Sequence, residues 1–183
     1  MRPRILILPV AAIIITAMVV YKQTRTYDQR LIGSVVRLQS APLFEEFDEN
    51  NQPVRLKTYI GRHIILLAFF NGELGADRDP QLLKLRAAHS QLAKQNIVVL
   101  AVGTSLPQEN RSAINRGEPF PFPLLSDVDY DTHRRWGRFD EATDRPFTGV
   151  FHIDRAGRVS STKNVPQPVV DLDRLLAEFA DKP

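Results

Sequence analysis

The chain has 183 residues, of which 43% are hydrophobic and 25% charged, and its formal net charge is +3. This length and composition fit one globular domain with a substantial core and a short additional segment at one end. Basic and acidic residues are interleaved along the chain, which argues against a nucleic-acid-binding protein. The sequence contains no cysteine, so disulfides, thiolate metal sites and thiol redox chemistry are excluded, whereas the compartment stays open.

The N-terminal segment, residues 5–21, is apolar and uncharged and has basic residues on both sides. It is at the short end of what spans a bilayer, and no small-residue cleavage signal follows it. We therefore expect residues 1–22 to form an uncleaved membrane anchor, with a cleaved signal peptide as the alternative. No polar face interrupts the run, which disfavours a buried core helix. Large C-terminal domains translocate largely regardless of flanking charge, so we expect this domain to be extracytoplasmic, on the periplasmic or extracellular side.

Residues 23–39 are polar and mixed, which predicts a linker, and residues 40–183 are expected to form the globular domain. The turn-rich stretch 48–52 lies between two short segments, 42–47 and 53–56, and this pattern predicts a β-hairpin. Two wholly apolar runs of strand length follow, at 64–70 and 97–102. Such runs are typical of central parallel strands that are covered on both faces.

A helix is predicted to begin between these two strands, because Asp79 is a good N-cap and Pro80 suits the first helical position. Its apolar residues recur at helical spacing, as a single stripe. The alternation of strands and helices predicts an α/β sandwich of the thioredoxin type, in which helices flank a mixed central sheet. The remaining predicted elements are a helix at 107–116, an extended segment at 121–125, a short helix at 128–136, two strands at 150–154 and 158–162 joined by a tight turn, and a closing amphipathic helix at 169–179.

Five segments, in this order, carry a family resemblance over roughly two-thirds of the chain. Their order and spacing resemble the alkyl hydroperoxide reductase/thiol-specific antioxidant (AhpC/TSA, redoxin) branch of the peroxiredoxins. The resemblance implies a thioredoxin-like fold and a thiol peroxidase ancestry, and it implies a dimer or partner interface near the active loop. Membrane-anchored thioredoxin-like proteins with a Cys-x-x-Cys motif share much of the same order of strands and helices. The segments are 44–61, Leu-Leu-Ala-Phe-Phe at 66–70, Ile-Val-Val-Leu-Ala-Val at 97–102, Phe-Pro-Leu-Leu-Ser-Asp at 122–127, and Gly-Val-Phe-His-Ile-Asp-Arg-Ala-Gly-Arg at 149–158.

The residues that give that family its chemistry are missing. In the family motif, a Pro, a Thr and the peroxidatic Cys precede a helix, and a distant Arg helps to stabilise the thiolate. By alignment these positions are Asn71, Gly75, Arg78 and Thr148. In an alignment with the Cys-x-x-Cys group, the motif corresponds to residues 75–78 and the cis-proline to Thr148. These positions also lack the residues that thiol chemistry needs. We therefore expect no thiol peroxidase activity by the family mechanism.

The loop that replaces the motif carries three carboxylates, Glu73, Asp77 and Asp79. Paired carboxylates can do acid–base chemistry, but the favoured interpretation is that Asp79 caps the helix and the other two are solvated loop acids. Arg78 could bind an anion together with helix N–H groups, point into water or pair with Asp77. Arg145 could also reach the site.

No other motif carries a strong functional signal. Residues 127–131 resemble the start of a calcium loop, but the required Gly and Glu are Thr132 and Arg138. The four histidines lack ligand spacing and are expected at the surface or at strand edges, and 140–144 is expected to be a solvated loop. There is no nucleotide-binding or serine-hydrolase motif. We expect no cofactor and no metal.

These observations favour a membrane-tethered, non-catalytic binding or scaffold module with a protein partner or a homodimeric interface. The alternative is an enzyme or ligand binder that uses Arg78 and the loop acids on a small anion. The least favoured hypothesis is a residual antioxidant role, in which peroxide is consumed by thiols borrowed from another molecule.

Overall fold

The computed structural model describes residues 36–180. The predicted anchor, and the predicted linker as far as residue 35, lie outside the described residues. Between residues 36 and 180, no helix is both long and apolar enough to cross a membrane. The compact unit that begins at Arg37 contains the fold described below.

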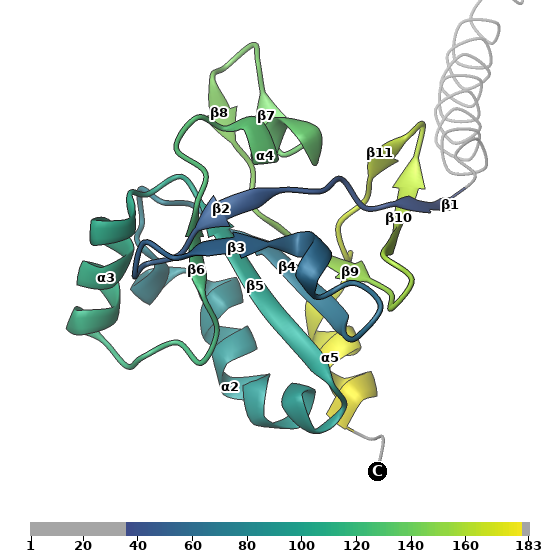
Figure 1. The fold of residues 1–183 in the computed structure, drawn as a ribbon, viewed down its shortest axis with the longest axis horizontal. Helices are drawn as coiled ribbons and strands as arrows, with labels where there is room; N and C mark the ends of the chain where they lie inside the picture. Colours follow the sequence, from purple (N-terminus) through teal and green to yellow (C-terminus); the bar gives the residue numbers. More distant parts are fainter. Residues whose placement is uncertain (1–35, 181–183) are drawn as a thin grey trace, which may run out of the picture. The chain divides into compact units, whose positions relative to one another are not determined.

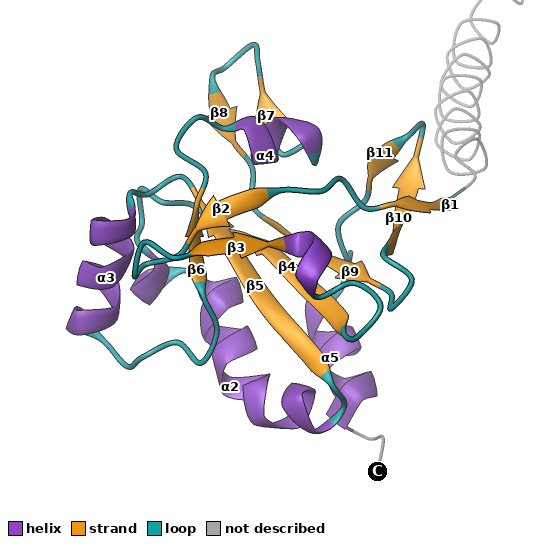
Figure 2. Cartoon of the chain, in the orientation of Figure 1, coloured by secondary structure: helices purple, strands orange, loops and turns teal. Residues whose placement is uncertain are grey.

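A mixed nine-stranded sheet forms the centre of this unit (Figures 1 and 2). β4 and β5 are parallel, β5 and β6 are parallel, and all other neighbouring strands are antiparallel. β11 (Val165–Pro166) pairs with β10 off the main path. In spatial order the other strands are β1 (Arg37–Ser40), β10 (Arg158–Thr162), β9 (Gly149–Ile153), β4 (Ile64–Phe69), β5 (Ile97–Gly103), β6 (Leu124–Ser126), β2 (Glu45–Phe47) and β3 (Pro53–Arg55).

The central strands separate two apolar layers because successive side chains of a strand point to opposite faces. From β4, Leu66 and Ala68 face a cluster that includes buried residues of α2 (Pro80–Lys94), α3 (Pro107–Arg116) and α5 (Leu172–Ala180). Leu67 and Phe69 face the other cluster, in which Trp136 follows the short helix α4 (Asp131–Arg135). The fold is thus a thioredoxin-like sandwich, with its core on both faces of the sheet.

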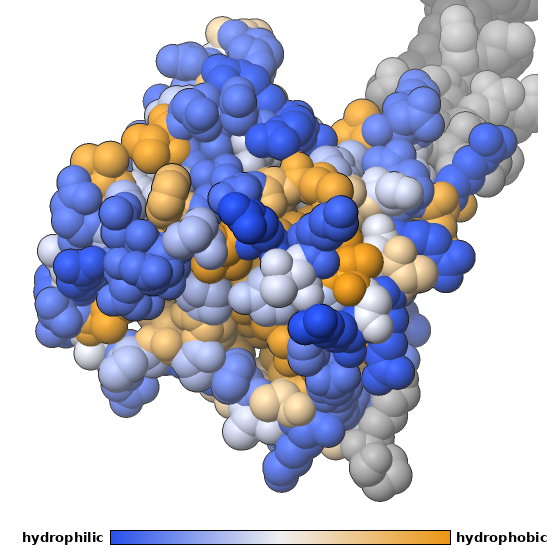
Figure 3. All heavy atoms as spheres, viewed as in Figure 1, coloured by the Kyte–Doolittle hydropathy of each residue, from blue (hydrophilic) through white to orange (hydrophobic). Residues whose placement is uncertain are grey.

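The surface of this unit is mainly hydrophilic on the face shown in Figure 3, and its apolar side chains lie in separate patches. Scattered exposed apolar side chains are normal for a soluble surface, so this face does not itself indicate an interface. One exposed apolar side chain matters below: Leu74 is 55% exposed and lies in the loop between β4 and α2.

Most predicted elements are confirmed, including the hairpin of β2 and β3, the helix at 107–116 and the closing helix, and two predictions are corrected. Strand β1 covers residues 37–39, which we assigned to the linker, and pairs with β10. The helix predicted at 128–136 begins only at Asp131, because Tyr130 has a φ of 63° and cannot continue a right-handed helix. The predicted loop at 140–144 is exposed from Glu141 to Asp144, and it connects two short strands that were not predicted, β7 (Phe139–Asp140) and β8 (Arg145–Pro146).

Candidate functional site

The loop between β4 and α2, residues 71–79, is the segment that the family resemblance aligns with the peroxiredoxin active loop. Its first turn is closed by Asn71, whose Oδ1 accepts a hydrogen bond from the backbone N–H of Glu73 at 2.9 Å. Gly75 follows with a φ of 81°, a conformation that favours glycine, and it leads into the short 3-10 helix η2 (Ala76–Arg78). The loop is therefore an ordered turn, built from local hydrogen bonds.

Asp79 ends the loop as the N-cap of α2, as predicted. Its Oδ1 accepts hydrogen bonds from the backbone N–H groups of Gln81 and Leu82, at 2.9 and 3.1 Å. Asp79 is 2% exposed, and its carboxylate is engaged in capping the helix.

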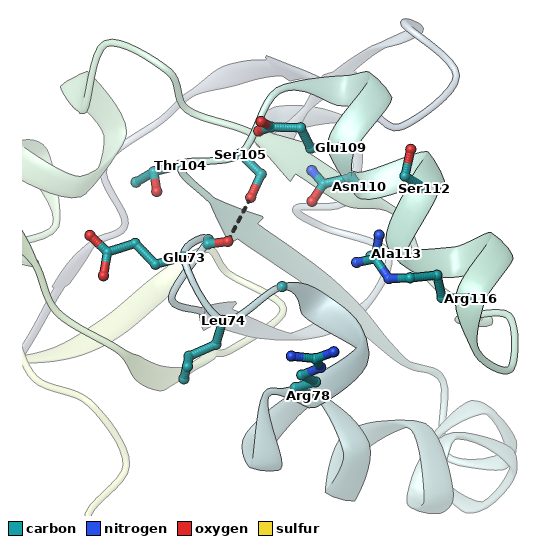
Figure 4. A pocket seen from close by; sticks show the side chains of 12 residues that line it. Glu73, Leu74, Arg78, Thr104, Ser105, Glu109, Asn110, Ser112, Ala113 and Arg116 are labelled. Carbon is teal, nitrogen blue, oxygen red and sulfur yellow. Dashed lines mark hydrogen bonds between the residues drawn. The ribbon is translucent and has the colours of Figure 1, made fainter.

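The loop faces an open recess of about 570 Å³ on the side of α3 (Figure 4). Two of the predicted site residues with charged side chains line it, Glu73 and Arg78, and Gly75 lines it as well. In Figure 4 the guanidinium groups of Arg78 and Arg116 lie at the same end of the recess, whereas the Glu73 carboxylate points away from them. The other lining residues are Gly72, Leu74, Thr104, Ser105, Glu109, Asn110, Ser112 and Ala113.

Asp77 lies next to both arginines of this recess. Its Oδ1 is 3.1 Å from Arg116 Nη2, and its Oδ2 is 4.0 Å from Arg78 Nε. The hydrogen bond from Arg116 lowers the pKa of Asp77. The Arg78 side chain is 75% exposed and that of Arg116 54%, so a single carboxylate leaves donors on both guanidinium groups open to solvent. This Arg–Asp–Arg group carries a net charge of +1.

Several other polar groups around the recess are already engaged. Ser105 Oγ donates to the carbonyl oxygen of Gly72 at 3.2 Å, and Glu109 Oε2 accepts from the backbone N–H of Leu106 at 2.8 Å. The amide of Asn110 donates to Ser126 Oγ at 3.2 Å. These bonds fix the wall of the recess, so the two arginines are its main chemical feature.

Replacing Gly72 with alanine is expected to displace the loop without affecting the core. A Cβ at this position would lie 2.6 Å from Ser105 Oγ, 2.7 Å from Thr104 Oγ1 and 2.9 Å from the backbone nitrogen of Ser105. We expect Gly72→Ala to lower the free energy of unfolding by about 1–3 kcal/mol and to weaken any ligand of the recess. Gly117→Ala is the control, since Gly117 has a φ of −128° that other residues can adopt, and a Cβ there would make only ordinary van der Waals contacts, at 3.7 Å to Asp77 Cβ and 4.0 Å to the Ala113 carbonyl oxygen. Urea unfolding of both variants measures the difference. An equal loss of stability in the two would contradict the account of close packing at Gly72.

The other two predicted site residues lie elsewhere. Thr148 lines a second recess, of about 450 Å³, together with the first turn of α2. Arg145 is in β8 opposite Asp140 and lines neither recess. The arginine beside Thr148 is instead Arg138, whose Nη1 donates to the Thr148 carbonyl oxygen at 3.5 Å and whose guanidinium lies 5.8 Å from the Phe147 ring centre. Sequence spacing did not predict this contact, because it depends on how the β7–β8 hairpin folds back.

A buried polar cluster between α4 and the sheet was not predicted, and it corrects the expectation for His133. Both His133 and Asp127 are fully buried, and His133 Nδ1 lies 2.5 Å from Asp127 Oδ2. Asp127 also accepts hydrogen bonds from the backbone N–H groups of Thr132 and His133. Burial raises the pKa of Asp127, but these bonds outweigh it, and its pKa is lowered overall. Asp127, the first carboxylate of the calcium-like motif, thus accepts hydrogen bonds from within the protein. Residues 36–180 hold no cluster of three or more His, Asp or Glu suited to a metal.

Glu46 joins the same cluster from β2, and its Oε1 accepts a hydrogen bond from Thr132 Oγ1 at 2.6 Å. Burial, supported by the nearby charges of Asp127 and Asp129, raises the pKa of Glu46 to about 7, although the Thr132 hydroxyl and Arg135 act in the opposite direction. The folded protein therefore holds this proton more tightly than the unfolded chain does. For this group, stability falls as the pH rises from about 4.5 towards 7.

The variant Glu46→Gln is expected to remove this part of the pH dependence. Because Glu46 is only half-buried, we expect a gain of about 1–2 kcal/mol in the free energy of unfolding at pH 8 and little change at pH 5. Urea unfolding at the two pH values measures it. A variant that is equally destabilised at both would show that the carboxylate is charged in the folded protein.

The chain's similarity to known proteins agrees with this fold. The sequence model of the AhpC/TSA family matches residues 38–162. Alkyl hydroperoxide reductase E of Mycobacterium tuberculosis is 29% identical over 120 residues, covering 64% of this chain and 78% of that protein. The M. bovis protein of the same name matches equally well.

Two solved structures illustrate the shared architecture. Peroxidoxin BcpB from M. tuberculosis superposes with a TM-score of 0.62 at 18% identity, covering 79% of this chain and 97% of that one. A mitochondrial 2-Cys peroxiredoxin from Plasmodium falciparum gives a TM-score of 0.59 at 17% identity, covering 77% and 90%. At this identity the superpositions show the fold alone. With the family match over most of the described residues, they establish that this cysteine-free chain belongs to the AhpC/TSA family.

Proposed function

We propose that this chain is a non-catalytic binding module, tethered to a membrane by residues 5–21, which recognises a protein partner through the loop 71–79. One observation carries the proposal: where its family places the peroxidatic thiol, this chain has the side chain of Arg78, 75% exposed at the rim of an open recess. An arginine cannot act as a nucleophile towards peroxide, but it is well suited to recognition.

The loss of the other active-site groups supports the same conclusion. Thr148 replaces the arginine that the family resemblance places beside the thiol, and Gly75 replaces the hydroxyl group. With no cysteine in the sequence, the chain has no thiol of its own to be oxidised and reduced in the family's peroxidase cycle. The fold is nevertheless complete, with core layers on both faces of the sheet.

The loop has the features of a preformed recognition surface. Its backbone is held by the turn at Asn71 and by the cap at Asp79, so little ordering entropy is lost on binding. Leu74 and Arg78 are both exposed on it, an apolar and a cationic side chain near one another in sequence. Arginine is enriched in protein interfaces, and Leu74 adds exposed apolar area that a partner can bury.

Crosslinking of the full-length protein in its native membranes tests this proposal. We expect a reproducible partner that is lost in the variants Leu74→Ala and Arg78→Glu. The matched control is Arg62→Glu, because Arg62 is an exposed arginine that precedes β4, whereas the loop follows the other end of that strand. No partner above background, or a partner that the two loop variants retain, would contradict the proposal.

A second candidate is a binding protein for a small anion, favoured by the Arg78–Asp77–Arg116 group. This group has one carboxylate for two guanidinium groups, so an incoming carboxylate or phosphate would complete the pairing. Thermal unfolding with a panel of anions tests it. Stabilisation by an anion that Arg78→Ala abolishes would support this candidate, and stabilisation unchanged by that substitution would exclude this site.

A further inference from the structure

The second recess lies between the first turn of α2, the start of β9 and the segment that leads into α5. Its volume is about 450 Å³, and its polar lining residues are Gln81, Lys84, Thr148, Asp171 and Asp173. In Figure 1, α2 and α5 lie side by side, and the first turn of each helix contributes lining residues to the recess, Pro80 and Gln81 from α2 and Leu172 and Asp173 from α5. It shares no lining residue with the arginine-lined recess.

The charges that line this recess are predominantly negative. Asp171 and Asp173 contribute two carboxylates, and Lys84 contributes one ammonium group, which lies 2.7 Å from Asp173 Oδ2. Asp171 Oδ1 accepts a hydrogen bond from the backbone N–H of Arg174. Among residues 36–180, no cationic side chain forms an ion pair with the Asp171 carboxylate. The lining therefore has a net charge of −1 and favours a cation.

A buried hydrogen-bond acceptor that lacks a donor adds to the preference of the recess for a cationic ligand. Gln81 lines the recess, and its Oε1 is buried with no hydrogen-bond partner in the described part of the chain. A buried acceptor that lacks a donor is unfavourable, so a ligand that brings an N–H group gains free energy here. The terminal amide torsion of glutamine is broad, so the oxygen can turn towards a donor in the recess at little cost.

The walls between these polar groups are apolar. Pro80, Val150, Pro168 and Leu172 line the recess next to the acids. A long basic side chain fits this combination, because its aliphatic stem can pack on apolar walls while its charged head reaches acceptors. Arg138, which donates a hydrogen bond to the Thr148 carbonyl oxygen, does not line the recess but lies against Phe147 and Phe151.

We infer that this recess binds a basic side chain, arginine or lysine, of a protein partner. The inference rests on the proposed function as a partner-binding module and gives the chemistry of one partner residue. Its head group pairs with Asp171 and donates to Gln81, and its stem lies between Pro80 and Pro168.

The test is titration of the ¹⁵N-labelled full-length chain in detergent with N-acetyl-arginine amide. We expect saturable shifts of the Gln81 side-chain amide and the Gly149 backbone amide. N-acetyl-citrulline amide, which has the same shape without the charge, is expected to bind at least fivefold more weakly. Asp171→Asn can still cap α5 and is expected to weaken binding, whereas Lys84→Gln is expected to strengthen it.

Equal binding of the charged and the neutral probe, or shifts that Asp171→Asn leaves unchanged, would overturn the inference. Agmatine distinguishes a free cation from a residue in a chain: tighter binding of agmatine than of the capped arginine would overturn the assignment to a protein side chain. The crosslinking experiment separates the two proposals. A partner lost in Arg78→Glu but retained in Asp171→Asn would overturn this inference alone, whereas arginine binding without any partner would overturn the proposed function.

Discussion

Replacing Asp127 with alanine is expected to lower the free energy of unfolding by about 3–5 kcal/mol. The Asp127 carboxylate is fully buried and accepts hydrogen bonds from the backbone N–H groups of Thr132 and His133, at 3.1 and 2.7 Å. It also lies 2.5 Å from His133 Nδ1. Alanine would leave two backbone donors and an imidazole nitrogen buried without their partner.

Urea unfolding can follow this effect through Trp136, the one tryptophan of the chain, which is fully buried. Asp129→Ala is the matched control, since Asp129 is exposed and its Oδ1 accepts a single hydrogen bond, from the backbone of Asp131. We expect that control to cost less than about 1 kcal/mol. Similar losses in the two variants would contradict a structural role for the buried cluster.

The lowered pKa of Asp127 also predicts a pH dependence. A carboxyl group whose pKa is lower in the folded than in the unfolded state stabilises the fold at pH values above its unfolded pKa. That contribution is lost as the pH falls through the folded pKa. We therefore expect Asp127→Ala to show a shallower loss of stability on acidification than the unmodified chain.

Placing a cysteine at position 78 is not expected to restore a peroxidase. The Arg78 side chain is 75% exposed, and the Asp77 carboxylate lies 4.0 Å from it. A thiol there would be solvated beside a negative charge, which disfavours the thiolate. Thr148 offers no guanidinium group to stabilise the developing charge. We expect the rate constant of Arg78→Cys with hydrogen peroxide to lie within about threefold of that of an ordinary exposed thiol.

Lys57→Cys supplies that ordinary thiol, since Lys57 is exposed in the short 3-10 helix η1 (Leu56–Thr58). Stopped-flow measurement of thiol loss compares the two variants. A rate for Arg78→Cys about a hundredfold or more above that of Lys57→Cys would show that the loop still activates a nucleophile, and would contradict a lost active site.

The architecture could be predicted from the sequence because its signals are local. Apolar runs of strand length gave the central strands, and the Asp79–Pro80 pair gave the start of α2. The strands at the edge of the sheet were harder to predict. Three of the four residues of β1 are polar and most are exposed, so the strand depends on its pairing with β10 and has little hydrophobic pattern.

The candidate site was predictable only where it follows the chain. Loop 71–79 was located by its place after β4, and the exposure of Arg78 with its contact to Asp77 was among the alternatives considered. The contribution of Arg116 was not predicted, because α3 reaches the loop only through the packing of the fold. The burial of His133 was likewise hidden, since a single histidine in a polar five-residue helix gives no sign that Asp127 lies beside it.

Hydroperoxide consumption by the unmodified full-length chain is the most direct test of a family fold retained without thiol chemistry. The assay supplies hydrogen peroxide or an organic hydroperoxide together with a thiol reductant, so that thiols borrowed from another molecule would also be detected. The account predicts a rate equal to that of the protein-free reaction at every protein concentration. Consumption that rises in proportion to protein and continues over many turnovers would contradict it.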